Sequence, residues 1–205
     1  MNKRQGLLFV ISAPSGAGKT SLCRAMTSSL ENITHSISYA TRKPRAGEVD
    51  GQDYHFVDLE RFKKMIDAGD FAEWAEVHSN LYGTSKRLLD NTVAKGIDVI
   101  LDIDTQGAKQ IKHKYERAIY VFIMPPSLDI LEERLRNRKS DQENEIRKRM
   151  LRAREEIKDY SMYDYQVVNS DFDRALSELR AIVSAERCRT WLMDQHWIEQ
   201  MLHYE

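Results

Sequence analysis

A lysine and a threonine close a glycine-containing segment near the start of the chain, residues 13–20, which reads APSGAGKT. Glycines let consecutive backbone N–H groups turn toward one anion, and a helix that begins there presents its positive N-terminal end to the same point. Lys19 can then bridge the β- and γ-phosphates of a nucleoside triphosphate, while the Thr20 hydroxyl can hold Mg²⁺. The segment therefore predicts a phosphate-binding loop made of Ser15, Gly16, Ala17, Gly18, Lys19, Thr20 and Ser21.

The neighbours of this loop are those that a phosphate-binding loop requires. An apolar run of strand length over residues 6–12 precedes it, and a helical pattern follows it. Ala13 stands where the strict pattern has its first glycine, so this residue must take a conformation that is open to a side chain. A glycine-rich turn without a ligand is the alternative, but such a turn does not call for Lys19 and Thr20 together.

An acidic motif, VILDID, closes a second apolar run at residues 99–104. Because a carboxylate at the end of a buried parallel strand lies at the edge where α/β proteins bind ligands, Asp102 can reach the Mg²⁺ shell directly or through water. A strand that ends in Asp is also a common cap for the next helix. Together with the phosphate loop, the motif favours Thr20 and Asp102 as the metal-binding pair.

Two arginines, Arg42 and Arg45, stand three residues apart in the segment SYATRKPRAGE at 38–48, and Tyr54 follows soon after. Guanidinium groups clamp phosphate in a bidentate manner, and a tyrosine hydroxyl adds a neutral donor. The segment therefore predicts a pocket for a monophosphate, which would be the second substrate of a phosphoryl transfer. A solvated basic loop is the alternative when the segment is taken alone.

Further apolar runs indicate the elements that must position these groups. Runs rich in β-branched residues at 97–103, 119–124 and 165–168 are each followed by a segment that can be helical. Near-continuous apolar strands that alternate with helices predict the α/β class, with a P-loop NTPase-type parallel sheet flanked by helices.

The stretch between the first two runs has a different texture and is expected to be an inserted lobe. Asp58 can cap a helix that ends before Gly69, and a second helix is expected over residues 85–95. The charge-dense stretch 128–160 is expected to be helical with a break around 138–143, and residues 172–202 to form one long amphipathic element. The predicted parts are a core with the phosphate loop (1–33), the lobe (34–95), core (96–126), a helical lid (127–150), and core with the C-terminal helix (151–205).

Composition excludes several classes of function. The 205 residues carry 31 Lys plus Arg against 32 Asp plus Glu, a formal net charge of −1, so no global basic field is expected to hold nucleic acid or anionic lipid. Cys23 and Cys188 form no CxxC pair and the six histidines show no metal-ligand spacing, so neither a disulfide framework nor a zinc site is indicated. The longest apolar runs fall far short of the roughly 20 residues that cross a bilayer. We therefore expect a soluble, cytoplasmic protein without nucleic-acid or membrane partners.

Large apolar residues recur at helical spacing near the end of the chain. For Trp191, Trp197 and Met201, packing in the core is the favoured interpretation. The alternative is a subunit interface, which would make the protein a homo-oligomer.

Further motifs complete a family pattern. SYATRKPRAGE, GQDY, EWAE, YGT and DIDTQG follow the phosphate loop in this order and at fitting intervals, and the chain thereby resembles the guanylate kinases of the bacterial type. The resemblance runs to about Ala185. It implies an enzyme that phosphorylates GMP with ATP and Mg²⁺, built from a core, a GMP-binding lobe and a lid that close over the two nucleotides.

The resemblance also implies roles for individual residues. Catalytic roles fall to Lys19, Arg42, Arg138 and Arg149. ATP is held by the phosphate loop together with Arg138 and Asn169. The GMP site comprises Ser38, Arg42, Arg45, Glu48, Tyr54, Glu73, Tyr82, Thr84 and Asp104. The chain departs from the family pattern at Ala40, where a threonine is common, and at Asn137 and Lys139, where many members have glycines around the lid arginine.

The chemistry of guanine supports the base-reading residues independently. Guanine offers donors at N1 and N2 and an acceptor at O6, so a reader needs carboxylates for the first two and hydroxyls for the third. Glu73 and Asp104 supply the carboxylates, and Ser38 and Thr84 supply the hydroxyls. Adenine would leave buried groups unpaired, a mismatch that can cost on the order of 10⁴-fold in selectivity.

Two other functions compete with this interpretation. A guanylate-kinase-like module that binds partner proteins and does no chemistry would lack a working phosphate loop, so the intact loop favours the enzyme. A P-loop kinase of the same fold with another acceptor, such as a phosphorylated ribose compound, is disfavoured by Glu73 and Asp104.

Overall fold

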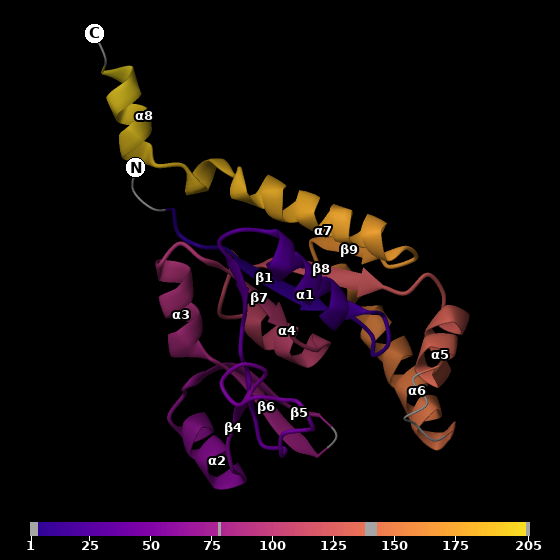
Figure 1. Cartoon of the computed structure of the whole chain (residues 1–205). Helices are drawn as coiled ribbons and strands as arrows, with labels where there is room; N and C mark the ends of the chain where they lie inside the picture. The colour runs from indigo at the N-terminus through magenta and orange to yellow at the C-terminus, as the bar shows by residue number, and fades with distance from the viewer. Residues whose placement is uncertain (1–3, 78, 138–142, 204–205) are drawn as a thin grey trace.

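A five-stranded parallel sheet lies at the centre of the computed structural model, which describes residues 4–77, 79–137 and 143–203. The strand order is β2-β7-β1-β8-β9, and each pair of neighbours is parallel (Figure 1). The predicted α/β class and parallel sheet are thereby confirmed. The strands are β1 (Leu8–Ser12), β2 (Ile33–His35), β7 (Asp98–Asp102), β8 (Ile119–Met124) and β9 (Tyr165–Val168).

Helices cover both faces of this sheet, and the side chains of β1 alternate between the two. Phe9 and Ile11 lie in one apolar cluster with residues of α1 and α7, and Leu8 and Val10 lie in a second cluster with residues of α3 and α4. Because both faces are buried, the strand is a continuous apolar run, as predicted. The helices are α1 (Lys19–Ser29), α3 (Lys86–Ala94), α4 (Thr105–Lys112) and α7 (Phe172–Arg187), with a 3-10 turn at Asp159–Met162 before β9.

A second, four-stranded sheet forms the lobe, which lies at the bottom of Figure 1. Its order is β4-β3-β6-β5, with β5 and β6 paired as an antiparallel hairpin. This sheet and its helix belong to the segment that the sequence predicts to be inserted. The elements are β3 (Tyr39–Ala40), β4 (His55–Phe56), α2 (Leu59–Asp67), β5 (Phe71–Val77) and β6 (Asn80–Ser85).

The helix boundaries in this region follow local rules that the sequence reveals. The Asp58 carboxylate accepts a hydrogen bond from the Arg61 N–H at the start of α2, and Gly69 follows the end of the helix with a φ of 70°. The Ser85 hydroxyl caps α3 in the same way, and Gly96 follows that helix with a φ of 79°. Both predicted helices are therefore confirmed, and Asp58 caps the first as predicted.

Two helices, α5 (Leu128–Asn137) and α6 (Glu143–Lys158), lie at the right of Figure 1 and include the predicted lid, residues 127–150, beyond which α6 continues. The Arg136 guanidinium on α5 donates to the Glu143 carboxylate on α6 over 2.6 Å and 2.7 Å. The ion pair joins the two helices end to end. Arg138, to which the sequence analysis assigns catalytic and ATP-binding roles, lies outside the described residues.

The structure corrects one expectation about the core sheet. Residue 34 is the expected start of the lobe, yet residues 33–35 form β2, which pairs with β7 at the edge of the central sheet. A strand of three residues is too short to show a pattern of its own.

The C-terminal segment is not the single long element that the sequence predicts. Helix α7 ends at Arg187, a 3-10 turn spans Thr190–Leu192, and α8 (Gln195–Leu202) points away from the body (Figure 1). The Asp194 side chain accepts hydrogen bonds from two N–H groups at the start of α8, which makes a new helix there.

The expected core packing of the C-terminal apolar residues is also wrong. Trp191 is 43%, Trp197 37% and Met201 60% exposed. Helical spacing alone does not determine what an apolar face packs against, and here α8 projects beyond the body.

Within the described ranges, no helix is long and apolar enough to cross a membrane.

A fully buried carboxylate ties the N-terminal segment and the end of α7 to the central sheet. Asp98, at the start of β7, accepts hydrogen bonds from Arg4 at 2.7 Å and 3.0 Å, from Arg187 at 2.7 Å and from the Leu7 N–H at 2.8 Å. A buried charge is tolerated only with such partners. The network therefore fastens the N-terminal segment and the end of α7 to the same strand.

We expect Asp98→Asn to destabilise the protein by about 3 kcal/mol, because the change leaves two guanidinium groups without their buried counter-charge. Urea unfolding of the variant measures the loss. Arg174→Gln is the matched control, since Arg174 pairs with Glu178 on an exposed helix surface over 3.0 Å and such pairs contribute little. Equal stability of the two variants would contradict the role of the network.

Candidate active site

The phosphate-binding loop connects β1 to α1 with two left-handed glycines. Gly16 has a φ of 100° and Gly18 a φ of 92°, a region in which side chains are strained. The Ala17 N–H donates to the Pro14 carbonyl over 3.0 Å, and Lys19 is the first residue of α1. Ala13 is not among the non-glycine residues with positive φ in the described chain, so the absence of the first glycine is accommodated by ordinary backbone geometry.

Asn169, which follows the edge strand β9, supports this loop although β8 lies between β9 and β1 in the sheet. Its Nδ2 donates to the Ala17 carbonyl over 2.7 Å, and a Cβ at Gly18 would lie 2.4 Å from that nitrogen. Arg134 on α5 in turn donates to the Asn169 carbonyl over 2.9 Å. Gly18 is thus required for close approach as well as for its φ. The predicted contact of Asn169 with ATP stays a prediction, and no sequence signal points to Arg134.

Lys19, Thr20 and Asp102 meet at the carboxyl edge of the sheet. The Lys19 ammonium lies 2.5 Å from one Asp102 oxygen and donates to the Ile103 carbonyl over 2.8 Å, while the Thr20 hydroxyl donates to the other Asp102 oxygen over 3.0 Å. Burial disfavours both charges, but the pairing outweighs it, so the pKa of Lys19 is raised and the pKa of Asp102 is lowered. The structure thus brings Lys19, Thr20 and Asp102 together, and both charges are maintained at neutral pH.

A second cationic group is organised at the edge of the lobe. The Arg42 guanidinium binds both oxygens of Glu48, over 2.5 Å and 2.7 Å, and lies 4.8 Å above the Tyr54 ring. The bidentate pair lowers the pKa of Glu48 to about 2 and raises the pKa of Arg42. The Tyr54 and Tyr82 rings meet edge to face with centroids 5.9 Å apart. The structure therefore brings Arg42, Glu48, Tyr54 and Tyr82 together.

Arg45 and Ser38, which are also predicted to belong to the GMP site, make their hydrogen bonds in this region through their backbones. The Arg45 N–H donates to a Glu48 oxygen over 2.8 Å, and its side chain is exposed. The Ser38 carbonyl accepts from the His55 N–H over 2.9 Å, which places Ser38 just before β3. Arg45 thus borders the Arg42–Glu48 pair, whereas Ser38 lies beside β4.

A buried carboxylate, Glu73 on β5, faces the core from the lobe. Glu73 is 4% exposed, and the Thr84 hydroxyl on β6 donates to it over 2.6 Å. Burial raises the pKa of Glu73 to about 7, although the hydrogen bond from Thr84 favours the charged form. A Cβ at Gly107 on α4 would lie 2.6 Å from the other carboxylate oxygen, so the glycine in DIDTQG makes room for this group.

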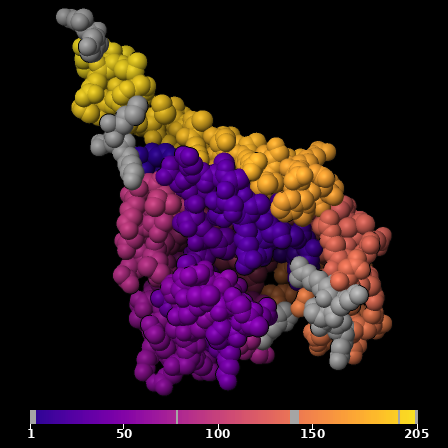
Figure 2. Space-filling view, in the orientation of Figure 1, coloured from indigo at the N-terminus to yellow at the C-terminus, as the bar shows by residue number. Residues whose placement is uncertain are grey.

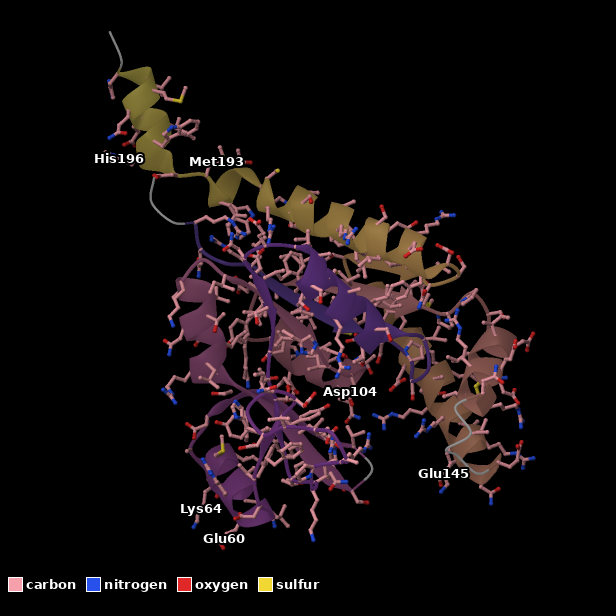
Figure 3. The ribbon with its side chains drawn as sticks, viewed as in Figure 1. Glu60, Lys64, Asp104, Glu145, Met193 and His196 are labelled. Atoms are coloured by element: carbon pink, nitrogen blue, oxygen red, sulfur yellow. The ribbon has the colours of Figure 1, made fainter. Side chains whose placement is uncertain are left out.

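Asp104 lies where the core, the lobe and the lid approach one another (Figure 3). One carboxylate oxygen accepts from the Gly107 N–H over 2.9 Å and so caps α4, and the other accepts from Arg152 on α6 over 3.1 Å. Arg152 also donates to Glu156 over 3.0 Å. Arg152 is not predicted from the sequence, because nothing in the charge-dense α6 distinguishes it from its neighbours. Arg149 lies half-buried on the same helix.

These groups lie close enough to act on one another across the parts of the chain. The charge of Asp102, beside the loop, acts on Tyr54 of the lobe, and the charge of Asp104 acts on Glu73. Figure 2 shows the surface recessed between the lobe and the two lid helices. Such an arrangement suits two anionic ligands that meet between the parts.

A phosphate loop with its lysine and acidic partner on a parallel sheet, facing a lobe with its own arginine clamp, defines a P-loop kinase of the nucleoside monophosphate class. The family model for guanylate kinase matches residues 5–186. The chain belongs to the guanylate kinase family.

Individual relatives agree over nearly the full chain. The guanylate kinase of Geobacter metallireducens is 53% identical over 92% of this chain and 93% of its own, and that of Geobacter sulfurreducens is 50% identical over the same shares. The crystal structure of guanylate kinase from Anaplasma phagocytophilum superposes with a TM-score of 0.82 at 33% identity, covering 100% of both chains.

The raised pKa of Glu73 predicts a pH-dependent contribution to stability. The pKa of Glu73 in the folded protein, about 7, lies above the ordinary value of 4.5. Between pH 4.5 and pH 7 the folded state therefore holds a proton on Glu73 that the unfolded state has lost. The contribution is complete below pH 4.5 and is lost as pH rises toward 7. Glu73→Gln mimics the protonated carboxyl at every pH, so we expect its free energy of unfolding to rise relative to the wild type by on the order of 3 kcal/mol between pH 4.5 and pH 8.

Urea unfolding of both proteins at several pH values measures this difference. Contributions from all other titrating groups cancel in the comparison. Parallel pH profiles for the two proteins would contradict the raised pKa.

Proposed function

We propose that this chain transfers the γ-phosphoryl group of ATP to GMP, giving ADP and GDP, by in-line attack of a GMP phosphate oxygen. The observation that carries the proposal is that the structure holds two cationic groups, Lys19 beside Asp102 and Arg42 beside Glu48, together with a buried carboxylate, Glu73, that can read guanine. Membership of the guanylate kinase family supports the same activity.

On the ATP side, the phosphates take the place that the Asp102 carboxylate now holds beside Lys19. The ammonium lies 2.5 Å from Asp102, and a phosphate offers it more negative charge. Loop N–H groups and the start of α1 hold the same anion. Ser15, Ser21 and Asn169 remain proposed contacts at the edge of this site.

The residues beside the loop suit Mg²⁺. The ion prefers oxygen ligands, and the Thr20 hydroxyl and the Asp102 carboxylate lie 3.0 Å apart. When Lys19 binds the phosphates in place of Asp102, both oxygen groups are available to the ion. We propose that Thr20 and Asp102 hold Mg²⁺ directly or through water. When bound, the ion neutralises charge on the phosphates.

On the GMP side, Arg42 and Arg45 clamp the phosphate with the hydroxyls of Tyr54 and Tyr82. Glu48 holds the Arg42 guanidinium in place through two hydrogen bonds, so the cation is oriented before the ligand arrives. Such preorganisation removes part of the entropic cost of binding. Glu48 therefore acts through Arg42.

Glu73 selects guanine by accepting hydrogen bonds from N1–H and N2–H, with the hydroxyls of Thr84 and Ser38 at O6 and Asp104 beside them. Accepting both bonds requires the ionised carboxylate, whereas burial holds the pKa of Glu73 at about 7 in the free protein. Binding of GMP therefore releases a proton near neutral pH. The carboxylate becomes available in the pH range in which the enzyme would work.

Phosphoryl transfer itself needs alignment and charge neutralisation rather than a catalytic base. Lys19 holds the phosphates of ATP, which donate the group, and Arg42 holds the phosphate of GMP, which accepts it. Arg149, with Arg138, contributes positive charge from the lid. Closure of the lobe and the lid excludes water, which would otherwise hydrolyse ATP.

A coupled assay with ATP, Mg²⁺ and a panel of acceptors tests the proposal. We expect turnover with GMP and little or none with AMP, CMP or phosphorylated ribose compounds. Lys19→Ala should lower kcat by at least about 10²-fold while the affinity for GMP is retained, since the lysine acts on charge that develops during transfer. Conversion of another acceptor in preference to GMP would overturn the substrate assignment, and no conversion at all would indicate a binding module.

Two further properties are part of the proposal. Cys23 and Cys188 are free thiols, which suits a reducing cytoplasm. Helix α8 lies beyond the family match at residues 5–186 and exposes an apolar face with Trp197, Ile198 and Met201. We propose that this face contacts a second copy of the chain, which would bury apolar area that the monomer leaves in water.

We therefore expect the full chain to sediment as a species larger than a monomer, and a chain that ends at Met193 to sediment as a smaller one. Truncation there keeps the contact of Trp191 with the Arg117 guanidinium, 5.0 Å apart, so the body is left intact. The same number of subunits in both proteins would contradict self-association through α8.

A further inference from the structure

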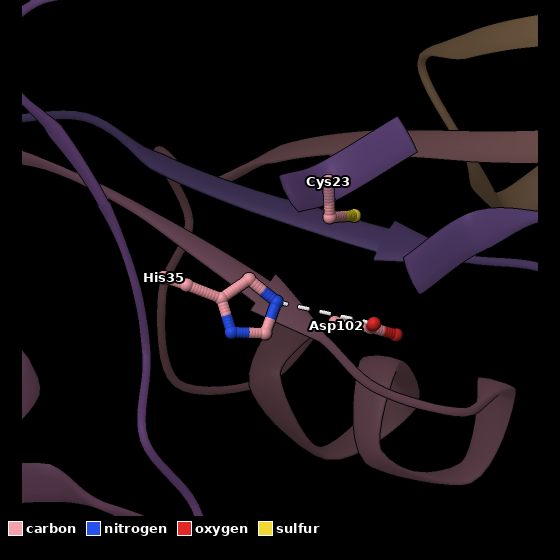
Figure 4. Close-up of side chains that lie close together, drawn as sticks. All are labelled: Cys23, His35 and Asp102. Carbon is pink, nitrogen blue, oxygen red and sulfur yellow. Dashed lines mark ion pairs between the residues drawn. The ribbon is translucent and has the colours of Figure 1, made fainter. Parts of the chain in front are cut away.

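Three side chains of different chemistry meet beside the phosphate loop. Cys23 lies one turn after Lys19 on α1, His35 ends β2, and Asp102 ends β7 (Figure 4). The Cys23 sulfur, an imidazole nitrogen of His35 and a carboxylate oxygen of Asp102 all lie within 4.8 Å of one another. We propose that these three side chains form a binding site for a borderline-soft divalent cation of the zinc class.

The spacing of the three atoms fits such an ion after a small movement. With zinc–sulfur bonds of about 2.3 Å and zinc–nitrogen or zinc–oxygen bonds of about 2.0 Å, ligand atoms in a tetrahedral site lie roughly 3–4 Å apart. His35 Nε2 and Asp102 Oδ2 are already 3.9 Å apart. Three protein ligands leave the fourth position for water.

The orientation of His35 supports this assignment. Its Nε2 atom is buried and makes no hydrogen bond in the described structure, although a buried polar atom without a partner is unfavourable. Metal-binding histidines present such a nitrogen to the ion in a fixed direction. Figure 4 shows that direction to be toward Asp102.

The donor set distinguishes this site from the magnesium site proposed beside it. A sulfur, an imidazole nitrogen and a single carboxylate oxygen suit Zn²⁺ or Co²⁺, whereas Mg²⁺ prefers oxygen ligands alone. On binding, the Cys23 S–H bond breaks, a sulfur–metal bond forms and the proton leaves to solvent. Thiolate and carboxylate together then balance the charge of the ion, while Lys19 keeps its contact with the other Asp102 oxygen.

Occupancy of this site would affect the proposed phosphoryl transfer, and this consequence rests on the proposed function. Asp102 Oδ2, the oxygen nearest His35, is also the acceptor of the Thr20 hydroxyl at 3.0 Å. A cation shared by Cys23, His35 and Asp102 would draw that oxygen away from Thr20. We therefore expect Zn²⁺ to inhibit the enzyme in competition with Mg²⁺.

Binding is tested on the full chain without nucleotide, so that its outcome is independent of the enzymatic assignment. Co²⁺ is added under anaerobic conditions, and the near-ultraviolet thiolate-to-cobalt absorption band is recorded. Zn²⁺ displaces the Co²⁺ in a competition titration that gives its affinity. The variants are Cys23→Ala and His35→Asn, and Cys188→Ala, which removes the exposed thiol, is the matched control.

We expect one thiolate-bound Co²⁺ per chain in the wild type and in Cys188→Ala, and no such band in Cys23→Ala. His35→Asn should keep the thiolate band but weaken zinc binding by roughly tenfold or more. Circular dichroism shows that each variant is folded. Persistence of the band in Cys23→Ala, its loss in Cys188→Ala, or unchanged zinc affinity in His35→Asn would overturn the site.

Discussion

The ion pair between Lys19 and Asp102 is the interaction on which the active-site architecture depends. It joins the first residue of α1 to the last residue of β7, with nitrogen and oxygen 2.5 Å apart. Burial alone would favour neutral forms of both groups, but each keeps the other charged. The protein thereby keeps a positive charge at the start of α1, and in the proposed mechanism the phosphates of ATP replace Asp102 as its anionic partner.

The other charges of the site follow the same rule, because each is held by a partner that also orients it. Glu48 holds Arg42 through two hydrogen bonds, Thr84 donates to Glu73, and Arg152 donates to Asp104. The last contact links the lid helix α6 to the carboxylate that caps α4. The position of α6 is therefore coupled physically to Asp104, which we propose to lie beside the base.

Two glycines make these contacts possible by letting the backbone approach a polar side chain. Gly18 leaves room for the Asn169 amide, and Gly107 leaves room for the Glu73 carboxylate, each at a distance that a Cβ would violate. The first contact joins the phosphate loop to β9, and the second joins α4 of the core to β5 of the lobe. Substitution at either glycine would therefore disturb packing between parts of the chain far apart in sequence.

The sequence by itself determined the phosphate loop, the parallel sheet, the inserted lobe and the capped helices α2 and α3, because these depend on local spacing and on apolar runs. It also assembled the candidate site through the family pattern. Only the tertiary structure decided that Arg152 reaches Asp104, that Asp98 is fully buried between two arginines, and that His35 lies beside Cys23 and Asp102. The same holds for α8, whose apolar face has helical spacing but projects from the body. Contacts between distant segments leave no periodic trace in a single chain, since they depend on how strands and helices are brought together in space.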